Sequence, residues 1–130
     1  MVSLLVDEAY AFDFLCILQV KSDKTNLESA KQTFLDYMKV FTMQFGRVMM
    51  DEIIGSEEYA RLYAANLHTF DLVDRAKTDS CKASDVDRAN YERCKARKAL
   101  QDKFFPGRQI TETKTGYEVY DNDNAKENIQ

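Results

Sequence analysis

The pattern of hydrophobic and polar residues is typical of helices over most of this chain. Residues 9–20 (AYAFDFLCILQV) contain only Tyr10, Asp13 and Gln19 as strongly polar side chains. A helix that is apolar on nearly every face has to be surrounded, either by its own chain or by a second copy of it. Because this run is longer than a typical strand, we expect a helix over residues 7–22, with the other helices packed around it.

A second helix is predicted over residues 26–55, with Asn26 as its N-cap and Gly55 ending it in the left-handed conformation. Its apolar stripe is wide enough to contact two neighbours, or one neighbour and a partner chain. Gly46 lies inside this helix and allows a bend or a close approach. The stripe contains Leu27, Ala30, Phe34, Met38, Phe41, Phe45, Val48 and Ile53.

Two further helices are predicted in the second half of the chain. Ser56 is the expected N-cap of a third helix, and Asn66 lies in the middle of its apolar face. Ser84 and Asp87 resemble a capping box for a fourth helix over residues 85–105. Residues 110–120 predict a short strand, hairpin or extended arm, and residues 121–130 a disordered tail. The predicted fold is all-α, a bundle of four main helices in one domain of residues 1–120.

Composition and charge narrow the class of protein. The chain has 130 residues with a formal net charge of -4, so it lacks the cationic character of a nucleic-acid binder, although residues 77–103 are locally basic. No apolar run approaches the roughly 20 residues of a membrane span, and residues 1–6 lack the positive region of a signal peptide. Three cysteines without paired spacing indicate a reducing compartment, with Cys16 buried. We expect a cytoplasmic protein with no nucleic-acid or membrane partner.

Catalytic motifs are missing from the sequence. His68 is the only histidine, no cysteine stands at ligand spacing to it, and the four glycines are scattered. A catalytic triad, a zinc site or a phosphate-binding glycine loop is therefore not expected.

Carboxylates offer one catalytic alternative. Asp71 and Asp74 share a face of the third helix and, with Asp51 and Glu52, could hold Mg²⁺. All-α nucleotide pyrophosphohydrolases use acidic residues on neighbouring helices in this way, but their paired Glu-x-x-Glu and Glu-x-x-Asp motifs are not reproduced here. Solvated or ion-paired Asp71 and Asp74 are the competing interpretation. No other cofactor is expected.

Asp13 is the most informative polar residue because it lies inside the most apolar stretch. A carboxylate there must be paired, solvated at a cleft, or neutralised, and a cation from the fourth helix is a natural partner. Two interpretations remain open. One is a buried ion pair that fixes helix packing. The other is a cleft for a small anionic or nucleotide ligand, lined by Asp13, Lys21, Asn66, Asp71, Asn90, Tyr91, Arg93 and Arg97.

Several segments resemble a family of small uncharacterised helical proteins from bacteria and their phages. Residues 12–21 (FDFLCILQVK) are similar to the opening motif of that family, in which an apolar residue and Asp precede a Thr/Ser-Ile-Leu-Glu-Ile-Lys run. Similar pieces follow in the same order at residues 62–66 (LYAAN), 70–74 (FDLVD), 90–98 (NYERCKARK) and 110–117 (ITETKTGY). Tyr10, Phe14 and Gln19 replace charged residues of the family. The resemblance implies a helical fold and a bacterial or phage setting, but no activity.

Three functions are compatible with these features. The favoured one is a non-catalytic helical binding protein that forms homo-oligomers, because a four-helix chain cannot easily hide both an apolar first helix and a broad Met/Phe face. The second is a protein that sequesters a small anionic or nucleotide signal, held by Arg93 and Arg97 with Tyr91 stacked on a base. The third is a Mg²⁺-dependent nucleotide phosphohydrolase.

Overall fold

The fold is all-α, as predicted. The computed structural model describes residues 1–108, so the predicted arm at residues 110–120 and the predicted tail at residues 121–130 lie outside the described residues. The helices of the described part are α1 (Glu8–Lys24), α2 (Glu28–Phe45), α3 (Arg47–Ile54), α4 (Glu57–Ala76) and α5 (Ala83–Phe104). No helix within residues 1–108 is both long enough and apolar enough to cross a membrane.

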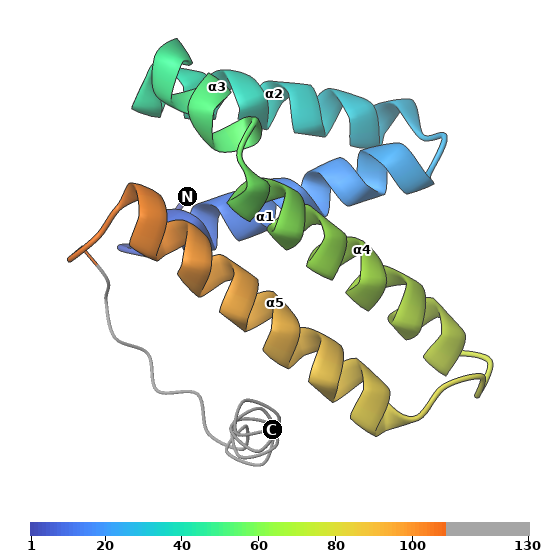
Figure 1. The fold of residues 1–130 in the computed structure, drawn as a ribbon. Helices are drawn as coiled ribbons and strands as arrows, with labels where there is room; N and C mark the ends of the chain where they lie inside the picture. The colour runs from blue at the N-terminus through green and yellow to red at the C-terminus, as the bar shows by residue number, and fades with distance from the viewer. Residues whose placement is uncertain (109–130) are drawn as a thin grey trace, which may run out of the picture.

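Helix α1 is the element that the other long helices cover. It forms a hairpin with α2, and the hairpin of α4 and α5 packs against it, so that α1 contacts α2, α4 and α5 (Figure 1). Short α3 links the two hairpins and contacts α2 and α4. The predicted central role of this stretch is confirmed, because seven of its residues are buried: Ala9, Phe12, Asp13, Leu15, Cys16, Leu18 and Val20.

An aromatic cluster joins the first half of α1, the end of α2 and the residue after α5. The Phe12 ring lies 5.2 Å from the Phe41 ring in edge-to-face contact, and 5.3 Å from the ring of Phe45. Phe105, which follows the last turn of α5, stacks on Phe12 at 6.4 Å. Aromatic rings bury much apolar area and favour such offset and edge contacts. The first, second and fifth helices are therefore held together at this end.

The predicted second helix is two helices, so a short fifth helix, α3, accompanies the four main helices of the prediction. Gly46 has φ 84° and ψ 154°, a conformation that is open to glycine and strained for other residues. The chain turns there, so that α2 ends at Phe45 and α3 begins at Arg47. The expected bend at Gly46 is a complete interruption.

Helix termini follow the sequence only in part. Ser56 caps α4 as predicted, because its hydroxyl accepts a hydrogen bond of 3.1 Å from the Tyr59 backbone N–H. Gly55 has an ordinary φ of -83°, which corrects its expected left-handed conformation. The N-cap of α2 is Leu27 rather than Asn26.

The start of α5 also differs from the prediction. The N-cap is Lys82, whose backbone N–H donates to the Asp85 carboxylate at 2.9 Å. The predicted pair of Ser84 and Asp87 lies two residues further on, inside the helix. An aspartate three residues after the cap satisfies the same orphan N–H in either register, which is why the sequence alone did not distinguish them.

Replacing Gly46 with alanine is expected to lower the free energy of unfolding by about 1–3 kcal/mol, the usual cost of holding a non-glycine residue in a strained backbone conformation. No atom lies within 4 Å of the added Cβ, so the loss would be purely conformational. Gly55→Ala is the matched control, since its φ is ordinary and its added Cβ meets only the Asp51 carbonyl oxygen, at 3.1 Å. Urea unfolding followed by circular dichroism measures both, and a larger loss for Gly55→Ala would contradict this account.

Candidate functional site

The Asp13 carboxylate is held by side chains from two other helices. Its Oδ2 atom lies 3.3 Å from Nη1 of Arg97 and 3.5 Å from Nε of Arg93, both on α5. Its Oδ1 atom accepts a hydrogen bond of 2.8 Å from the Asn66 side-chain amide on α4. The expected cationic partner from the last helix is confirmed. We call Asp13, Asn66, Arg93 and Arg97 the Asp13 cluster.

Local helix geometry brings these groups together. Arg93 and Arg97 are four residues apart, so both lie on the same face of α5, one turn from each other. Asn66 uses its second N–H to donate to the Leu62 carbonyl oxygen at 3.0 Å, so its amide nitrogen is fully used. The Arg97 guanidinium also lies over the Tyr10 ring of α1, 4.8 Å from its centroid. A buried carboxylate with several donors of this kind has its desolvation cost offset.

Positive charge is in excess in the Asp13 cluster. Two guanidinium groups share one carboxylate oxygen, and the buried Arg93 Nε atom lies 3.5 Å from this oxygen without forming a hydrogen bond. The Arg93 and Arg97 side chains are 26% and 15% exposed, so each is partly accessible from the surface, while the Asp13 side chain is buried. The cluster can therefore lock three helices together and still present cationic donors to an anion from outside.

The other predicted ligand-binding residues do not join this cluster. Asp71 forms an ion pair of 3.3 Å with Lys24 at the far end of α1. The Tyr91 ring is buried, with the Lys95 ammonium 5.3 Å from its centroid, so it is not open for stacking on a base. Asn90 is half-buried on α5, one turn before Arg93. The sequence placed these residues in one site, whereas the helices distribute them along the bundle.

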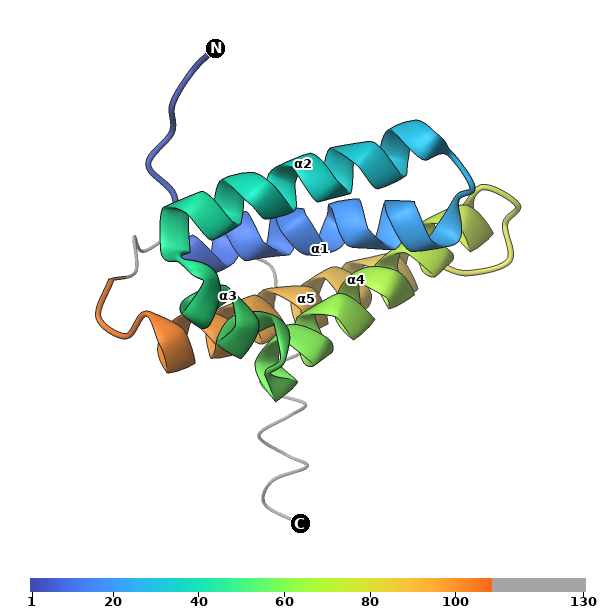
Figure 2. The ribbon, with the colours of Figure 1, turned by 90° about the horizontal axis from the view of Figure 1, so that it is seen from above.

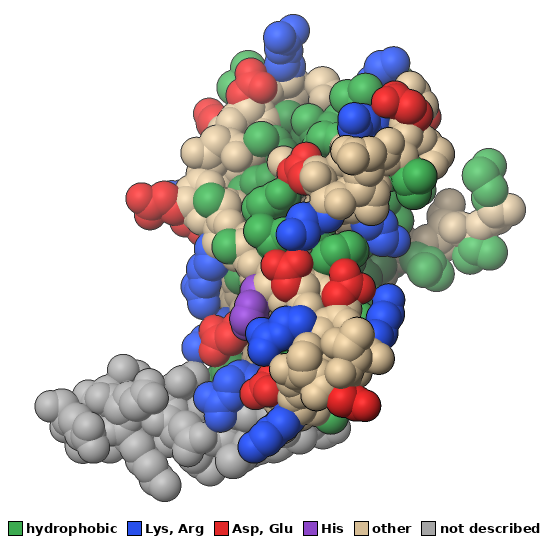
Figure 3. All heavy atoms as spheres, turned by 90° about the vertical axis from the view of Figure 1, so that its right-hand side faces the viewer, with side chains coloured by type: hydrophobic (Ala, Val, Ile, Leu, Met, Phe, Trp, Pro, Cys, Tyr) green, Lys and Arg blue, Asp and Glu red, His purple; other side chains and the backbone are tan. Residues whose placement is uncertain are grey.

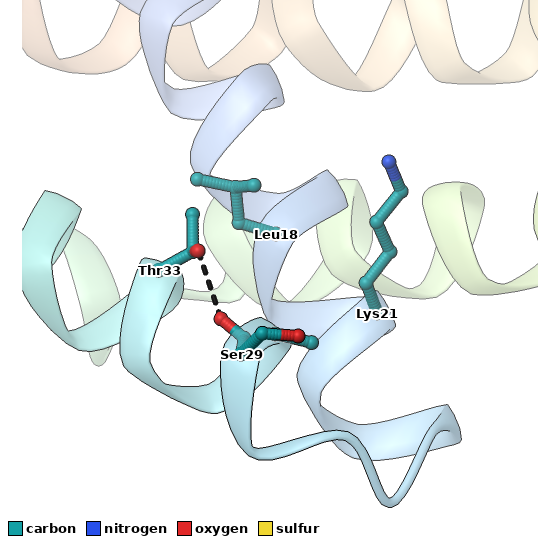
Figure 4. Close-up of a pocket in the computed structure, with 5 residues that line it drawn as sticks. Leu18, Lys21, Ser29 and Thr33 are labelled. Carbon is teal, nitrogen blue, oxygen red and sulfur yellow. Dashed lines mark hydrogen bonds between the residues drawn. The ribbon is translucent and has the colours of Figure 1, made fainter.

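Lys21 lies on a separate hollow between the end of α1 and the start of α2. This hollow of about 240 Å³ is lined by Leu18, Lys21, Ser29, Ala30 and Thr33. Figure 4 shows the Thr33 hydroxyl turned back to the Ser29 carbonyl oxygen, to which it donates at 2.8 Å. Lys21 is eight residues beyond Asp13, which is about 12 Å along a helix. The hollow is open, and Lys21 is the single charged residue in its lining.

The two carboxylates proposed for Mg²⁺ are both paired with lysines. Asp74 lies 3.3 Å from the Lys77 ammonium, and Asp71 pairs with Lys24 as described above. Asp51 and Glu52 are exposed on α3, which follows the interruption at Gly46. Within residues 1–108, no three His, Cys, Asp or Glu side chains gather closely enough to hold a metal ion. The contacts of Asp71 and Asp74 are those of the ion-paired interpretation.

Gln101 is a structurally important residue that the sequence interpretation missed. Its side-chain oxygen accepts a hydrogen bond of 2.8 Å from the Ala9 backbone N–H, at the start of α1. Its amide nitrogen donates to the Glu8 carboxylate at 2.8 Å. The N-cap residue Asp7 makes no side-chain cap hydrogen bond, so the Gln101 side chain satisfies a backbone N–H in the first turn of α1 instead. The spacing of Arg93, Arg97 and Gln101 at four-residue intervals is the signal that places all three on one face of α5.

A polar contact inside the core links α1 and α4. The Tyr59 hydroxyl donates to the Gln19 side-chain oxygen at 2.7 Å and also hydrogen-bonds to the Cys16 thiol. Burial is the main cause that raises the pKa of Cys16 to about 12, and burial likewise raises the pKa of Tyr59. A hydrogen bond to the Asp23 carboxylate is the main cause that raises the pKa of Tyr63 to about 12. These groups are neutral near pH 7, and the expected buried role of Cys16 is confirmed.

The raised pKa of Cys16 predicts a loss of stability in alkaline solution. The unfolded chain releases this proton near pH 9, whereas the folded chain keeps it to about pH 12, so the unfolded state binds fewer protons between these values. The free energy of unfolding therefore falls as pH rises through this window, by up to about 1.4 kcal/mol per pH unit for this group. Cys16→Ala should make the decline between pH 9 and 11 less steep. Urea titrations at several pH values measure it, and an unchanged slope would contradict the assignment.

Helices α2 and α3 carry apolar side chains on the side away from the core. Phe41 is the single fully buried residue of α2, although the helix has 18 residues. Large apolar side chains that face solvent on these two helices are Leu35, Tyr37, Val40, Met43 and Val48. Figure 3, a view onto the right-hand side of Figure 1, shows hydrophobic side chains at the surface among charged ones. We call Leu35, Val40, Met43 and Val48 the outer face.

Comparisons of the chain with protein-family models, curated proteins and solved structures give no match. What the protein does must therefore be inferred from its own residues. Two features of residues 1–108 call for a functional explanation, the outer face of α2 and α3 and the cationic surplus of the Asp13 cluster.

Proposed function

We propose that this chain is a non-catalytic helical interaction protein that associates with a second copy of itself through the outer face. The observation that carries this proposal is the exposure of α2, in which one residue is fully buried while several large apolar side chains face water. A helix of a monomeric bundle usually buries one apolar stripe and keeps the opposite side polar. A cluster of large apolar side chains at the surface is a mark of an interaction site.

The character of the outer face favours an apolar partner surface. Val40 and Met43 are aliphatic and three residues apart, so they lie one turn from each other on α2. Leu35 on α2 and Val48 on α3 are 52% and 75% exposed and add further apolar area to these two helices. Flexible Met and aliphatic side chains adapt readily to the shape of an apolar partner. Free thiols and the resemblance to small bacterial and phage proteins support a cytoplasmic setting, the host cytoplasm for a phage protein.

A charge placed on the outer face tests this proposal. Val40 is 58% exposed, and Val73 on α4 is 42% exposed, so both tolerate lysine in a monomer. Val40→Lys is expected to weaken association at least tenfold, because it would place an unpaired charge in an apolar contact. Val73→Lys is the matched control and should leave association unchanged. Sedimentation velocity over a range of concentrations measures both, and equal behaviour of the two variants would overturn the assignment of the outer face.

A second candidate function is the capture of a small anion by the Asp13 cluster. The specific observation is the surplus of positive charge, with the Arg93 Nε atom buried and without a hydrogen bond. Arginine binds phosphate and carboxylate through paired N–H donors, and the side chains of both arginines are partly exposed. An anion bound there would complete the charge balance that Asp13 alone does not provide.

Thermal-shift measurements with inorganic phosphate, nucleotides, cyclic dinucleotides and sugar phosphates test the second candidate. A stabilising ligand should raise the unfolding temperature of the wild-type chain but not of Arg93→Ala. Arg61→Ala, which removes an exposed arginine of α4, is the control and should respond like the wild type. A panel without shifts, or shifts that survive Arg93→Ala, would exclude this site.

A further inference from the structure

Residues 1–6 form an apolar arm without contacts that would bury it. The arm consists of Met1, Val2, Ser3, Leu4, Leu5 and Val6, and all six residues are exposed. Figure 2 shows it leaving the start of α1 beside the end of α2 and pointing away from the helices. Isolated exposed apolar residues are normal, but five of them in a run of six are an exposed patch that calls for a partner.

The base of the arm is firmly anchored. The Glu8 carboxylate binds the Gln101 amide at 2.8 Å and lies 3.0 Å from the Arg108 guanidinium. The Ala9 backbone N–H is bound by the same Gln101 side chain. The first turn of α1 is thus fixed to the end of α5, so the arm starts from a defined point. That point lies at the same end of the molecule as the junction of α2 and α3 (Figure 2).

We propose that the arm of one copy lies along the outer face of a second copy, and that the second copy's arm returns the same contact. This inference rests on the proposed function and names the parts of the interface. An apolar arm and an apolar helix face on one chain are complementary surfaces. A two-fold arrangement uses each surface once per chain and leaves neither exposed, which is the closed symmetry that most homo-oligomers adopt.

Length and area both suit this exchange. Six extended residues span about 20 Å, which is the length of about 13 helical residues, so one arm can cover most of α2. A standard interface buries roughly 800 Å² per partner. The surface area of the arm's five large apolar side chains, when fully exposed, is of that order. The outer face that receives the other arm adds further area to the interface. The two surfaces together therefore meet the area that a stable dimer needs.

Disulfide trapping between differently labelled chains tests the exchange. Cys81→Ser and Cys94→Ser first remove the two partly exposed thiols, while buried Cys16 stays. One preparation of the full chain then carries Leu5→Cys and another Met43→Cys or Val40→Cys. After mixing and mild oxidation, we expect a disulfide between the two different chains at ten times or more the yield obtained with Val73→Cys, the control on α4. Deleting residues 2–6 should weaken association of the otherwise unchanged chain at least tenfold.

The outcomes separate this inference from the proposed function. If the wild-type chain associates but trapping does not exceed the Val73→Cys level, the exchange is wrong, and Val40→Lys still decides whether the outer face serves association. If a chain carrying both Leu5→Cys and Val40→Cys forms only an internal disulfide, the arm folds back on its own α2 and the exchange is again wrong. If the wild-type chain stays monomeric at all concentrations, both proposals fail.

Discussion

Asp13→Leu is expected to lower the free energy of unfolding by about 3 kcal/mol. The substitution leaves the Arg93 and Arg97 guanidinium groups without their shared carboxylate and the Asn66 amide without an acceptor. Removing one partner of a buried ion pair usually costs about 3–5 kcal/mol. The lower end applies here because both arginines retain access to water. Urea unfolding monitored by circular dichroism measures the loss.

Two further variants show whether the ion pair is the cause. Asp74→Leu removes an exposed carboxylate that pairs with Lys77, and it should cost less than about 1 kcal/mol. Combining Asp13→Leu with Arg97→Met should recover part of the lost stability, because the second change removes one of the uncompensated charges. Equal losses at Asp13 and Asp74 would contradict the interpretation of the Asp13 cluster as a lock between three helices.

Phe12→Ala is expected to cost about 4 kcal/mol, within the usual range for truncating a large core side chain. Phe12 is 0% exposed and contacts the rings of Phe41, Phe45 and Phe105, so its removal leaves a cavity at the meeting point of three helices. The same unfolding measurement reports this loss.

Phe14→Ala is the matched control for Phe12→Ala. Phe14 lies two residues further along α1 but is 43% exposed, and its main ring contact is with Tyr37 at 5.4 Å. It should cost less than about 1 kcal/mol, because a half-exposed side chain loses little buried area and leaves no closed cavity. A cost at Phe14 equal to that at Phe12 would mean that α1 is covered on a side that the monomer leaves open, as a second copy could cover it.

The helical class and the central position of α1 could be predicted because both follow from the pattern of apolar and polar residues within short stretches of sequence. A run of apolar residues on all faces has to be surrounded by other helices, and the Ser56 hydroxyl marks the start of a helix by accepting from a free backbone N–H. Asp13 could be assigned a cationic partner for the same kind of reason, since a carboxylate in that stretch cannot remain unpaired. These inferences need only the neighbouring residues and the general free-energy costs of exposing apolar side chains and burying unpaired charges.

The remaining features depend on which helices pack against each other, and short stretches of sequence do not determine this. The interruption at Gly46 was expected as a bend, because a glycine permits a break without requiring one. Lys21 and Asp71 were grouped with Asp13, but the lengths of α1 and α4 separate them. The apolar residues of the second predicted helix could be divided between a core and a partner surface in several ways. The packing of α2 on one side of α1 decides the division, and it leaves Val40 and Met43 outside.

Self-association through the outer face is tested most directly by the molar mass of the wild-type chain in solution. Size-exclusion chromatography with light scattering, run from low to high micromolar concentration, gives this mass without any substitution. The chain has a mass of 15.1 kDa, and we expect twice that value at the upper concentrations, with a shift towards the monomer on dilution. A constant mass of 15.1 kDa throughout would contradict the proposal that this protein works by binding a second copy of itself.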